Sequence, residues 1–348
     1  MRWKGWDRVP IRTDTGEPAE AVAPVIVSAS RSTDIPAFYG DWFMERLRRG
    51  YVRWKSPFGG KPVPVSFGKT RVFAFWSKNP APFFRHIGTL DRMGYSSFFL
   101  FTLNDYDRER LEPGVPPLDE RIETFIRLSG LVGKGRITWR FDPLLLADTI
   151  PVEELLDRVG AVGDRIHPFT KRMVFSFVEI ARYAKVQRNL REQGNGTVRE
   201  FTEEEIETFC EGLSRFNKKW GLRVSACADR RDLSRYGIAR GQCISYDLMI
   251  EEFGNDRALR EFLTGSGQQT LGSAGGPVPG EEMQKRLKDP GQRSSCRCIV
   301  SRDIGEYSTC PHLCAYCYAN SSRESVRRNY AAHMRAEQAG DYPDTITG

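Results

Sequence analysis

The sequence lacks the features that define several large classes of protein. No run of about 18 apolar residues occurs, so we expect no transmembrane helix. The segment Met1–Asp7 lacks the apolar core of a signal peptide, so we expect a cytoplasmic protein. Neither a GxGxxG nor a Walker sequence is present, which argues against an open nucleotide-binding sheet.

The charge is only mildly basic, and no sequence typical of a nucleic-acid-binding module is present. The net charge is +7, and the densest basic segments are Arg46–Arg49 and Arg323–Arg328. Such segments are most simply solvated helix faces. Binding to nucleic acid is therefore not favoured over a role without it.

Short apolar segments alternate with amphipathic ones along the chain of 348 residues, of which 40% are hydrophobic. The apolar segments predict strands at 25–30, 72–76, 98–102, 136–141, 173–178 and 223–227. Near-continuous apolar strands that alternate with helices are typical of parallel sheets covered on the outside. Six such units favour an α/β fold of the (β/α) barrel type, TIM-like or partial, over an open doubly wound sheet.

Helices are expected between these strands. One spans 41–49, the next repeats Phe83, Ile87 and Leu90 at helical spacing, and a third carries Ile122, Phe125 and Ile126. A fourth begins near Val152. A fifth begins at Thr202, where Thr202 and Glu205 have the spacing of a capping box.

The composition divides the chain into five segments. We expect an N-terminal arm at 1–24, the barrel at 25–250 and a flexible glycine-rich insertion at 251–293. A cysteine-rich segment that binds an iron–sulfur cluster follows at 294–334, and a polar tail occupies 335–348.

Polar side chains gather where the predicted strands end. They are Ser28, Ser30, Arg31, Asp34, Lys78, Asn79, Thr102, Asn104, Arg140, Asp142, Ser176, Glu179 and Cys227. Because chemistry in a barrel lies at the carboxyl ends of its strands, these residues predict a site there. Arg31, Lys78 and Arg140 would form a positive basin for a carboxylate or phosphate, with Asp34, Asp142 and Glu179 as partners. The other interpretation is a set of loop caps and ion pairs.

Three cysteines near the C-terminus have the spacing C-x3-C-x2-C, at Cys310, Cys314 and Cys317. Three thiolates this close can hold three corners of a cubane iron–sulfur cluster and leave the fourth iron open for chemistry. Alternatively they are three of four zinc ligands, completed by His312 or another cysteine. Unligated thiols at this density would be prone to oxidation.

The remaining cysteines suggest a second metal site. Cys210 lies on the amphipathic helix and is expected to be a buried hydrophobe. The four others are Cys227, Cys243, Cys296 and Cys298. Four thiolates are the number that completes a second [4Fe–4S] cluster or a structural zinc site. The alternative is that Cys227 and Cys243 belong to the core and the Cys296–Cys298 pair has no ligand role.

The triplet resembles the signature of the radical S-adenosylmethionine enzymes. The resemblance implies a [4Fe–4S] cluster on Cys310, Cys314 and Cys317, whose open iron binds S-adenosylmethionine and cleaves it reductively to a 5′-deoxyadenosyl radical. Tyr316 would contact the adenine, and Arg31, Lys78 and Asn79 would hold the carboxylate or ribose. Arg31, Lys78, Arg140 and Asp142 are the catalytic candidates. An electron donor such as flavodoxin or ferredoxin and an unidentified small-molecule or peptide substrate are implied.

More of the chain resembles an uncharacterised bacterial family of unknown function, loosely related to spore photoproduct lyase and photolyase-like repair proteins. The segments that carry this resemblance are 28–37, 75–82, 140–143, 236–238 and 303–320. In radical S-adenosylmethionine enzymes the triplet usually follows the first barrel strand, whereas here it follows the last. The segment must therefore fold back over its own strand ends or dock on a partner subunit. A metalloprotein with structural cysteines and a nucleic-acid repair protein are the competing functions.

Overall fold

An eight-stranded sheet of parallel strands is the centre of the computed structural model, which describes residues 3–181, 183–192, 198–265 and 279–348. Its strand order is β11-β10-β9-β8-β7-β6-β3-β12. The strands are β3 (Ile26–Ala29), β6 (Val72–Ser77), β7 (Ser96–Thr102), β8 (Ile137–Leu144), β9 (Arg172–Phe177), β10 (Arg223–Ala226), β11 (Ala239–Arg240) and β12 (Arg302–Asp303). The six predicted strands are all present, and the mixed α/β class with a parallel sheet is confirmed.

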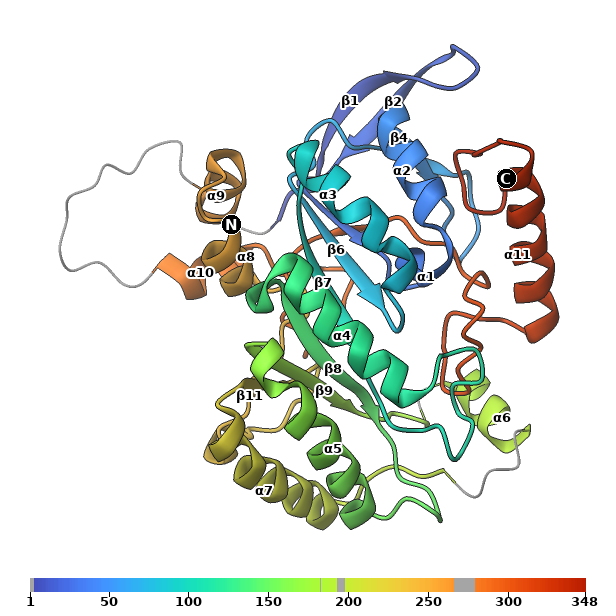
Figure 1. Ribbon diagram of the computed structural model, residues 1–348. Coiled ribbons are helices and arrows are strands. Elements are labelled where there is room, and N and C mark those ends of the chain that lie inside the picture. Colours follow the sequence, from blue (N-terminus) through green and yellow to red (C-terminus); the bar gives the residue numbers. More distant parts are fainter. Residues whose placement is uncertain (1–2, 182, 193–197, 266–278) are drawn as a thin grey trace.

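Helices α3, α4, α5 and α7 cover one face of this sheet (Figure 1). The described helices are α1 (Ile35–Phe38), α2 (Gly40–Arg49), α3 (Phe84–Arg92), α4 (Leu118–Val132), α5 (Val152–Ile166), α6 (Ala184–Glu192), α7 (Glu203–Trp220), α8 (Tyr246–Phe253), α9 (Arg257–Thr264), α10 (Pro279–Arg286) and α11 (Arg323–Gln338). The predicted capping box starts α7, where the Thr202 hydroxyl accepts from the Glu205 N–H and the Glu205 carboxylate accepts from the Thr202 N–H. Helices α3, α4, α5 and α7 follow one another across the sheet (Figure 1).

The strands bury both of their faces, which explains why they are apolar throughout. One set of side chains packs with the helices α2 to α7, and it includes Phe73, Phe75, Phe99 and Phe101. The alternate set packs on the other face, and it includes Val72, Ala74, Phe98 and Leu100. That second face is covered by residues of α8, α9 and the segment 296–300, which contains two buried cysteines, Cys296 and Cys298. Alternation along a strand thus assigns one set to each layer.

The segment expected to be an N-terminal arm instead belongs to a second, smaller sheet. Strand β1 (Asp7–Arg12) pairs antiparallel with β2 (Pro18–Ala23), and the order continues to β5 (Val63–Ser66) and β4 (Tyr51–Trp54). Small side chains such as Ala21 and Ala23 fill the buried positions. These residues carry little hydrophobic signal, which is why the sequence pattern did not indicate strands there.

The last residues are docked rather than free. Helix α11 continues to Gln338, and the segment after it crosses back over α2 and β4. The Trp42 indole N–H donates to the Pro343 carbonyl at 2.8 Å, and the Arg53 N–H donates to the Asp344 carbonyl at 2.6 Å. Ile346 is buried. The expected polar tail at 335–348 is therefore part of the packed structure.

The predicted glycine-rich insertion at 251–293 contains ordered elements. Helix α9 and the end of α8 lie within it, as does α10. Its residues 266–278, which carry four of its eight glycines, lie outside the described residues. None of the helices in the described part of the chain is both long and apolar enough to cross a membrane.

Candidate functional site

A cavity of about 320 Å³ opens where the strands of the large sheet end. Residues near the carboxyl ends of β3, β6, β7, β8, β9 and β10 line it, together with the cysteine-rich segment of the same chain. Seven of the eight cysteines line it, namely Cys227, Cys243, Cys296, Cys298, Cys310, Cys314 and Cys317. The sequence allowed the C-terminal segment either to fold back over its own strand ends or to dock on a partner subunit. In this structure it folds back over the strand ends of its own chain.

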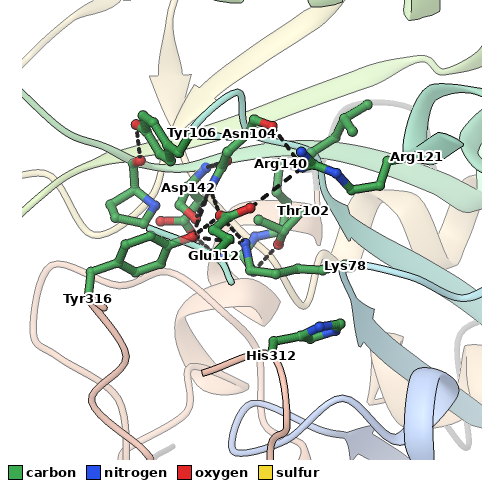
Figure 2. Close-up of polar contacts among 12 residues, drawn as sticks. Lys78, Thr102, Asn104, Tyr106, Glu112, Arg121, Arg140, Asp142, His312 and Tyr316 are labelled. Carbon is green, nitrogen blue, oxygen red and sulfur yellow. Dashed lines mark hydrogen bonds and ion pairs between the residues drawn. The ribbon is translucent and has the colours of Figure 1, made fainter. Parts of the chain in front are cut away.

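A buried polar network fastens the triplet to the strand ends (Figure 2). The Lys78 ammonium donates to Glu112 Oε1 at 2.7 Å and to the Tyr316 hydroxyl at 2.9 Å. The Tyr316 hydroxyl in turn donates to Glu112 Oε1. The Asn104 amide donates to both acceptors, at 2.9 Å and 3.0 Å. Because Tyr316 lies between Cys314 and Cys317, these bonds fix the position of both cysteines.

Glu112 carries the negative charge of this network. Its side chain is 1% exposed. Its second carboxylate oxygen, Oε2, lies 3.5 Å from a guanidinium nitrogen of Arg121. Burial opposes its ionisation, but Lys78 and Arg121 outweigh burial and lower the pKa of Glu112 to about 2. The site therefore holds a carboxylate that is ionised at neutral pH and balanced by two cations.

A second set of contacts holds the loop of the triplet through His312. Its Nε2 lies 2.8 Å from Asp34 Oδ2, and its Nδ1 lies 2.9 Å from the Gly114 carbonyl oxygen. Both ring nitrogens thus have partners, so His312 does not serve as the fourth metal ligand that the zinc interpretation requires. Gly114 has to be glycine, because a Cβ there would come within 2.3 Å of the Pro311 carbonyl oxygen.

The predicted cations reach the cavity, but each already has a partner. Lys78 pairs with Glu112 as described above. Arg31 lies 3.9 Å from Asp289 and donates to the Ser301 hydroxyl at 3.1 Å. Arg140 pairs with Asp142 and lies over the Trp76 ring at 4.5 Å. Asp142 also accepts from Ser176.

Two buried donors that face the cavity lack a partner in the described structure. They are the Thr33 hydroxyl and the Arg140 Nε. Thr33 is 5% exposed, so its hydroxyl has also lost most of its access to bulk water. A buried donor without a hydrogen bond raises the free energy of the folded protein. A ligand that accepts a hydrogen bond from that donor removes this penalty.

Most of the polar residues predicted at the strand ends line the cavity. Asn79 does not line it; its side-chain oxygen accepts from the Ala81 N–H at 3.3 Å. Glu179 lines it and pairs with Arg293 at 2.6 Å. Glu112 and Arg121 were not predicted, because Glu112 lies in a loop without periodicity and Arg121 lies on an ordinary amphipathic helix.

The thiols are free in this structure. Burial raises the pKa of the Cys310 and Cys314 thiols. The Ala319 N–H donates to the Cys317 sulfur at 3.4 Å. As placed, no group of three or more His, Cys, Asp or Glu side chains in the described residues has the spacing of a bound metal ion.

Fold and site together define a parallel α/β protein with a cysteine-lined cavity at the carboxyl ends of its strands. The family model described as Domain of unknown function (DUF1848) matches residues 26–319, and the chain belongs to this family. The match covers the large sheet and extends just past the triplet. No curated protein matches the chain, and no solved structure matches it.

The Glu112 network makes a prediction about stability. Glu112→Gln leaves the largely buried Lys78 without its counter-charge and leaves Arg121 with Asp107 alone, at 2.6 Å, so we expect the free energy of unfolding to fall by about 3–5 kcal/mol. Urea unfolding of the full chain measures it. The control is Glu261→Gln, which breaks the exposed Arg257–Glu261 pair at 2.8 Å and should cost under about 0.5 kcal/mol. Equal effects of the two substitutions would contradict a dominant role for the buried pair.

The same pair predicts a pH dependence. The folded-state pKa of Glu112 is about 2 and its unfolded value is near the ordinary 4.5. Its stabilisation is therefore fully present above pH 4.5 and is lost as the pH falls towards 2. The stability difference between the wild type and Glu112→Gln should shrink across that window. A difference that stays constant from pH 5 to pH 3 would show that Glu112 does not titrate as inferred.

Proposed function

We propose that this protein is an iron–sulfur enzyme of the radical S-adenosylmethionine type, with a [4Fe–4S] cluster on Cys310, Cys314 and Cys317. The observation that supports it best is the place of the triplet, on a cavity at the carboxyl ends of parallel strands in its own chain. A cluster there would face the polar residues of the strand ends rather than the solvent. That is the geometry a cluster needs in order to act on a bound molecule.

The strand order supports a partial (β/α) barrel as the fold. Strands β3, β6, β7, β8, β9, β10 and β11 neighbour one another in the order of the sequence. An open doubly wound sheet reverses its strand order at the point where it binds ligands, and this sheet has no such reversal among these strands. A sheet that adds strands in one direction curls towards a barrel, because each strand is twisted relative to its neighbour.

The residues of the triplet fit a cluster with one open iron. Backbone N–H groups of His312 and Asp34 lie against the Cys310 sulfur, and that of Ala319 against the Cys317 sulfur. Such N–H groups stabilise thiolate charge and tune iron–sulfur centres. His312, the side chain nearest in sequence that could complete a zinc site, is engaged by Asp34 and Gly114. Three protein ligands for four irons leave one iron for the cofactor.

Different residues of the chain would then contact different parts of S-adenosylmethionine. Thr33 and Arg140 offer the unpartnered donors, which suit the carboxylate and the hydroxyl groups of S-adenosylmethionine. Lys78 acts as a positioning residue, because its ammonium is spent on Glu112 and Tyr316. Tyr316 presents its ring to the cavity while its hydroxyl is held, so the ring face is what remains for the adenine.

When bound, the cluster and S-adenosylmethionine supply a 5′-deoxyadenosyl radical that takes hydrogen from a substrate. The protein's part is to keep this chemistry away from water. For this the cavity is lined in part by apolar side chains, the half-buried Trp76 and Phe177 and the buried Val178. An external electron donor such as flavodoxin or ferredoxin is needed for each turnover, and the substrate is a small molecule or a peptide.

The first test of this function uses Cys314→Ala. In protein prepared without oxygen and reconstituted with iron and sulfide, we expect about four irons per chain at the triplet in the wild type. Reduction with S-adenosylmethionine should then yield 5′-deoxyadenosine. Cys314→Ala should lose both the irons and the product while its circular dichroism spectrum stays native.

The matched control is Cys210→Ala. Cys210 is buried in α7, away from the cavity, and burial raises the pKa of its thiol to about 12. The control should keep the irons and the product. An intact, reducible cluster that never cleaves S-adenosylmethionine would overturn the proposed function, and so would equal product from the wild type and Cys314→Ala.

A second test uses Thr33→Val, which removes a hydroxyl that has no partner. The change nearly preserves shape, so the thermal unfolding midpoint and the cluster should be unaffected. Binding of S-adenosylmethionine should weaken by about 5–10-fold, the value of one hydrogen bond. Isothermal titration of the reconstituted protein measures it. Thr208→Val, on the exposed face of α7, is the control. Unchanged affinity in Thr33→Val would remove Thr33 from the binding site.

A further inference from the structure

Four cysteines outside the triplet form a cluster of their own. The Cys243 sulfur lies 3.6 Å from the Cys227 sulfur. The Cys298 N–H donates to the Cys296 sulfur at 3.5 Å, and the N–H of Ile244, next to Cys243, donates to the Cys298 sulfur at 3.4 Å. The four cysteines therefore gather in one place, and all of them line the cavity. Cys243, Cys296 and Cys298 are each at most 4% exposed.

These cysteines come from the two edges of the large sheet. Cys227 directly follows β10 and Cys243 follows β11, the strand at one edge. Cys296 and Cys298 precede β12, the strand at the opposite edge. In the described structure β11 and β12 do not pair with each other. The four cysteines thus lie where two unpaired edges of the sheet approach each other.

Other contacts hold the two edges in register around the thiols. The Ile299 N–H donates to the Ile244 carbonyl at 3.1 Å, and the Ser295 hydroxyl donates to the Ala228 carbonyl at 2.7 Å. The Ile244 N–H donates to the Cys298 sulfur at 3.4 Å. Gly241 lets the β11 segment approach closely, because a Cβ there would lie 2.7 Å from the Ala226 carbonyl oxygen.

The distance between two of the sulfur atoms suits a single ion better than a cluster. Four thiolates around a tetrahedral zinc, with Zn–S bonds of about 2.3 Å, keep their sulfurs about 3.8 Å apart. The 3.6 Å between the Cys227 and Cys243 sulfurs is close to that value. A cubane cluster binds each thiolate at a separate iron and keeps the sulfurs farther apart.

The charge around the four thiols suits a divalent ion. A tetrathiolate around a divalent ion has a net charge of −2, which burial would penalise without nearby cations. Three cations are within electrostatic reach: Arg31 acts on Cys298, Arg140 on Cys243, and Arg293 on Cys227 and Cys296. Each of them already pairs with a carboxylate, so together they offset part of the charge rather than all of it.

We propose that Cys227, Cys243, Cys296 and Cys298 bind a single zinc ion that joins the two open edges of the sheet. Binding turns the four thiols into thiolates bonded to the ion, and four protons leave to the solvent. The ion takes the place of strand pairing between β11 and β12 and thereby closes the wall of the cavity. The site does not depend on the chemistry of the triplet.

The test separates this site from the triplet by removing the triplet. The full chain with Cys310, Cys314 and Cys317 all changed to alanine is produced in medium with added zinc, and its metals are measured by mass spectrometry. We expect one zinc per chain and no iron. Adding Cys243→Ser should abolish the zinc, whereas adding Cys210→Ser should retain it. Removing zinc with a chelator should lower the unfolding midpoint by roughly 5–10 °C.

A second measurement covers the case in which Cys243→Ser fails to fold. Cobalt replaces zinc in the triplet variant, and the absorption spectrum reports its ligands. The intense ligand-field and thiolate charge-transfer bands of a tetrahedral tetrathiolate site support the proposal. Octahedral bands, about four irons per chain in the triplet variant, or zinc that persists in Cys243→Ser would each overturn it. None of these results bears on cleavage of S-adenosylmethionine.

Discussion

The hydroxyl of Tyr316 on the buried Lys78–Glu112 ion pair is the contact on which the site depends. It joins the end of β6, the loop after β7 and the cysteine segment, and the last of these is 204 or more residues away in sequence. Taking two charges out of water is expensive, and the cost is offset only when further hydrogen bonds satisfy them. Asn104 and Tyr316 supply hydrogen bonds to Glu112, and Arg121 adds an ion pair at 3.5 Å. The buried charges are therefore satisfied in only one position of the loop, and other positions of the loop are higher in free energy.

Asp34 gives this arrangement a second fixed point. One oxygen of its carboxylate caps α1 through the Ala37 N–H, and the other accepts from the Lys78 N–H and lies against His312. A single carboxylate thus connects the ends of β3 and β6 with the cysteine loop. The two fixed points flank Cys314, with Asp34 acting through His312 on one side and Glu112 acting through Tyr316 on the other. The loop is positioned by these buried polar bonds together with the packing of Ala315 and Tyr316 against the core.

The large sheet was predictable because its signals are local. Strands such as β6 and β7 bury both faces and so read as unbroken apolar runs, and the Thr202–Glu205 capping box is complete within four residues. The cavity's polar lining was also predictable, since strand ends are visible in the sequence. Roles within it were not. Lys78 looks like a free cation until Glu112 is brought against it by a loop that has no periodic pattern. The β1–β2 hairpin was not predicted for a similar reason: its buried residues are small, so they give no hydrophobic pattern in the sequence.

The central claim is that the triplet holds a cluster whose open iron binds S-adenosylmethionine inside this cavity. The most direct test is electron–nuclear double resonance on the reduced, reconstituted protein with S-adenosylmethionine labelled at its amino nitrogen. The account predicts a changed cluster signal and a hyperfine coupling from the labelled nitrogen. A reduced cluster whose signal is identical with and without the cofactor, and which shows no such coupling, would contradict it.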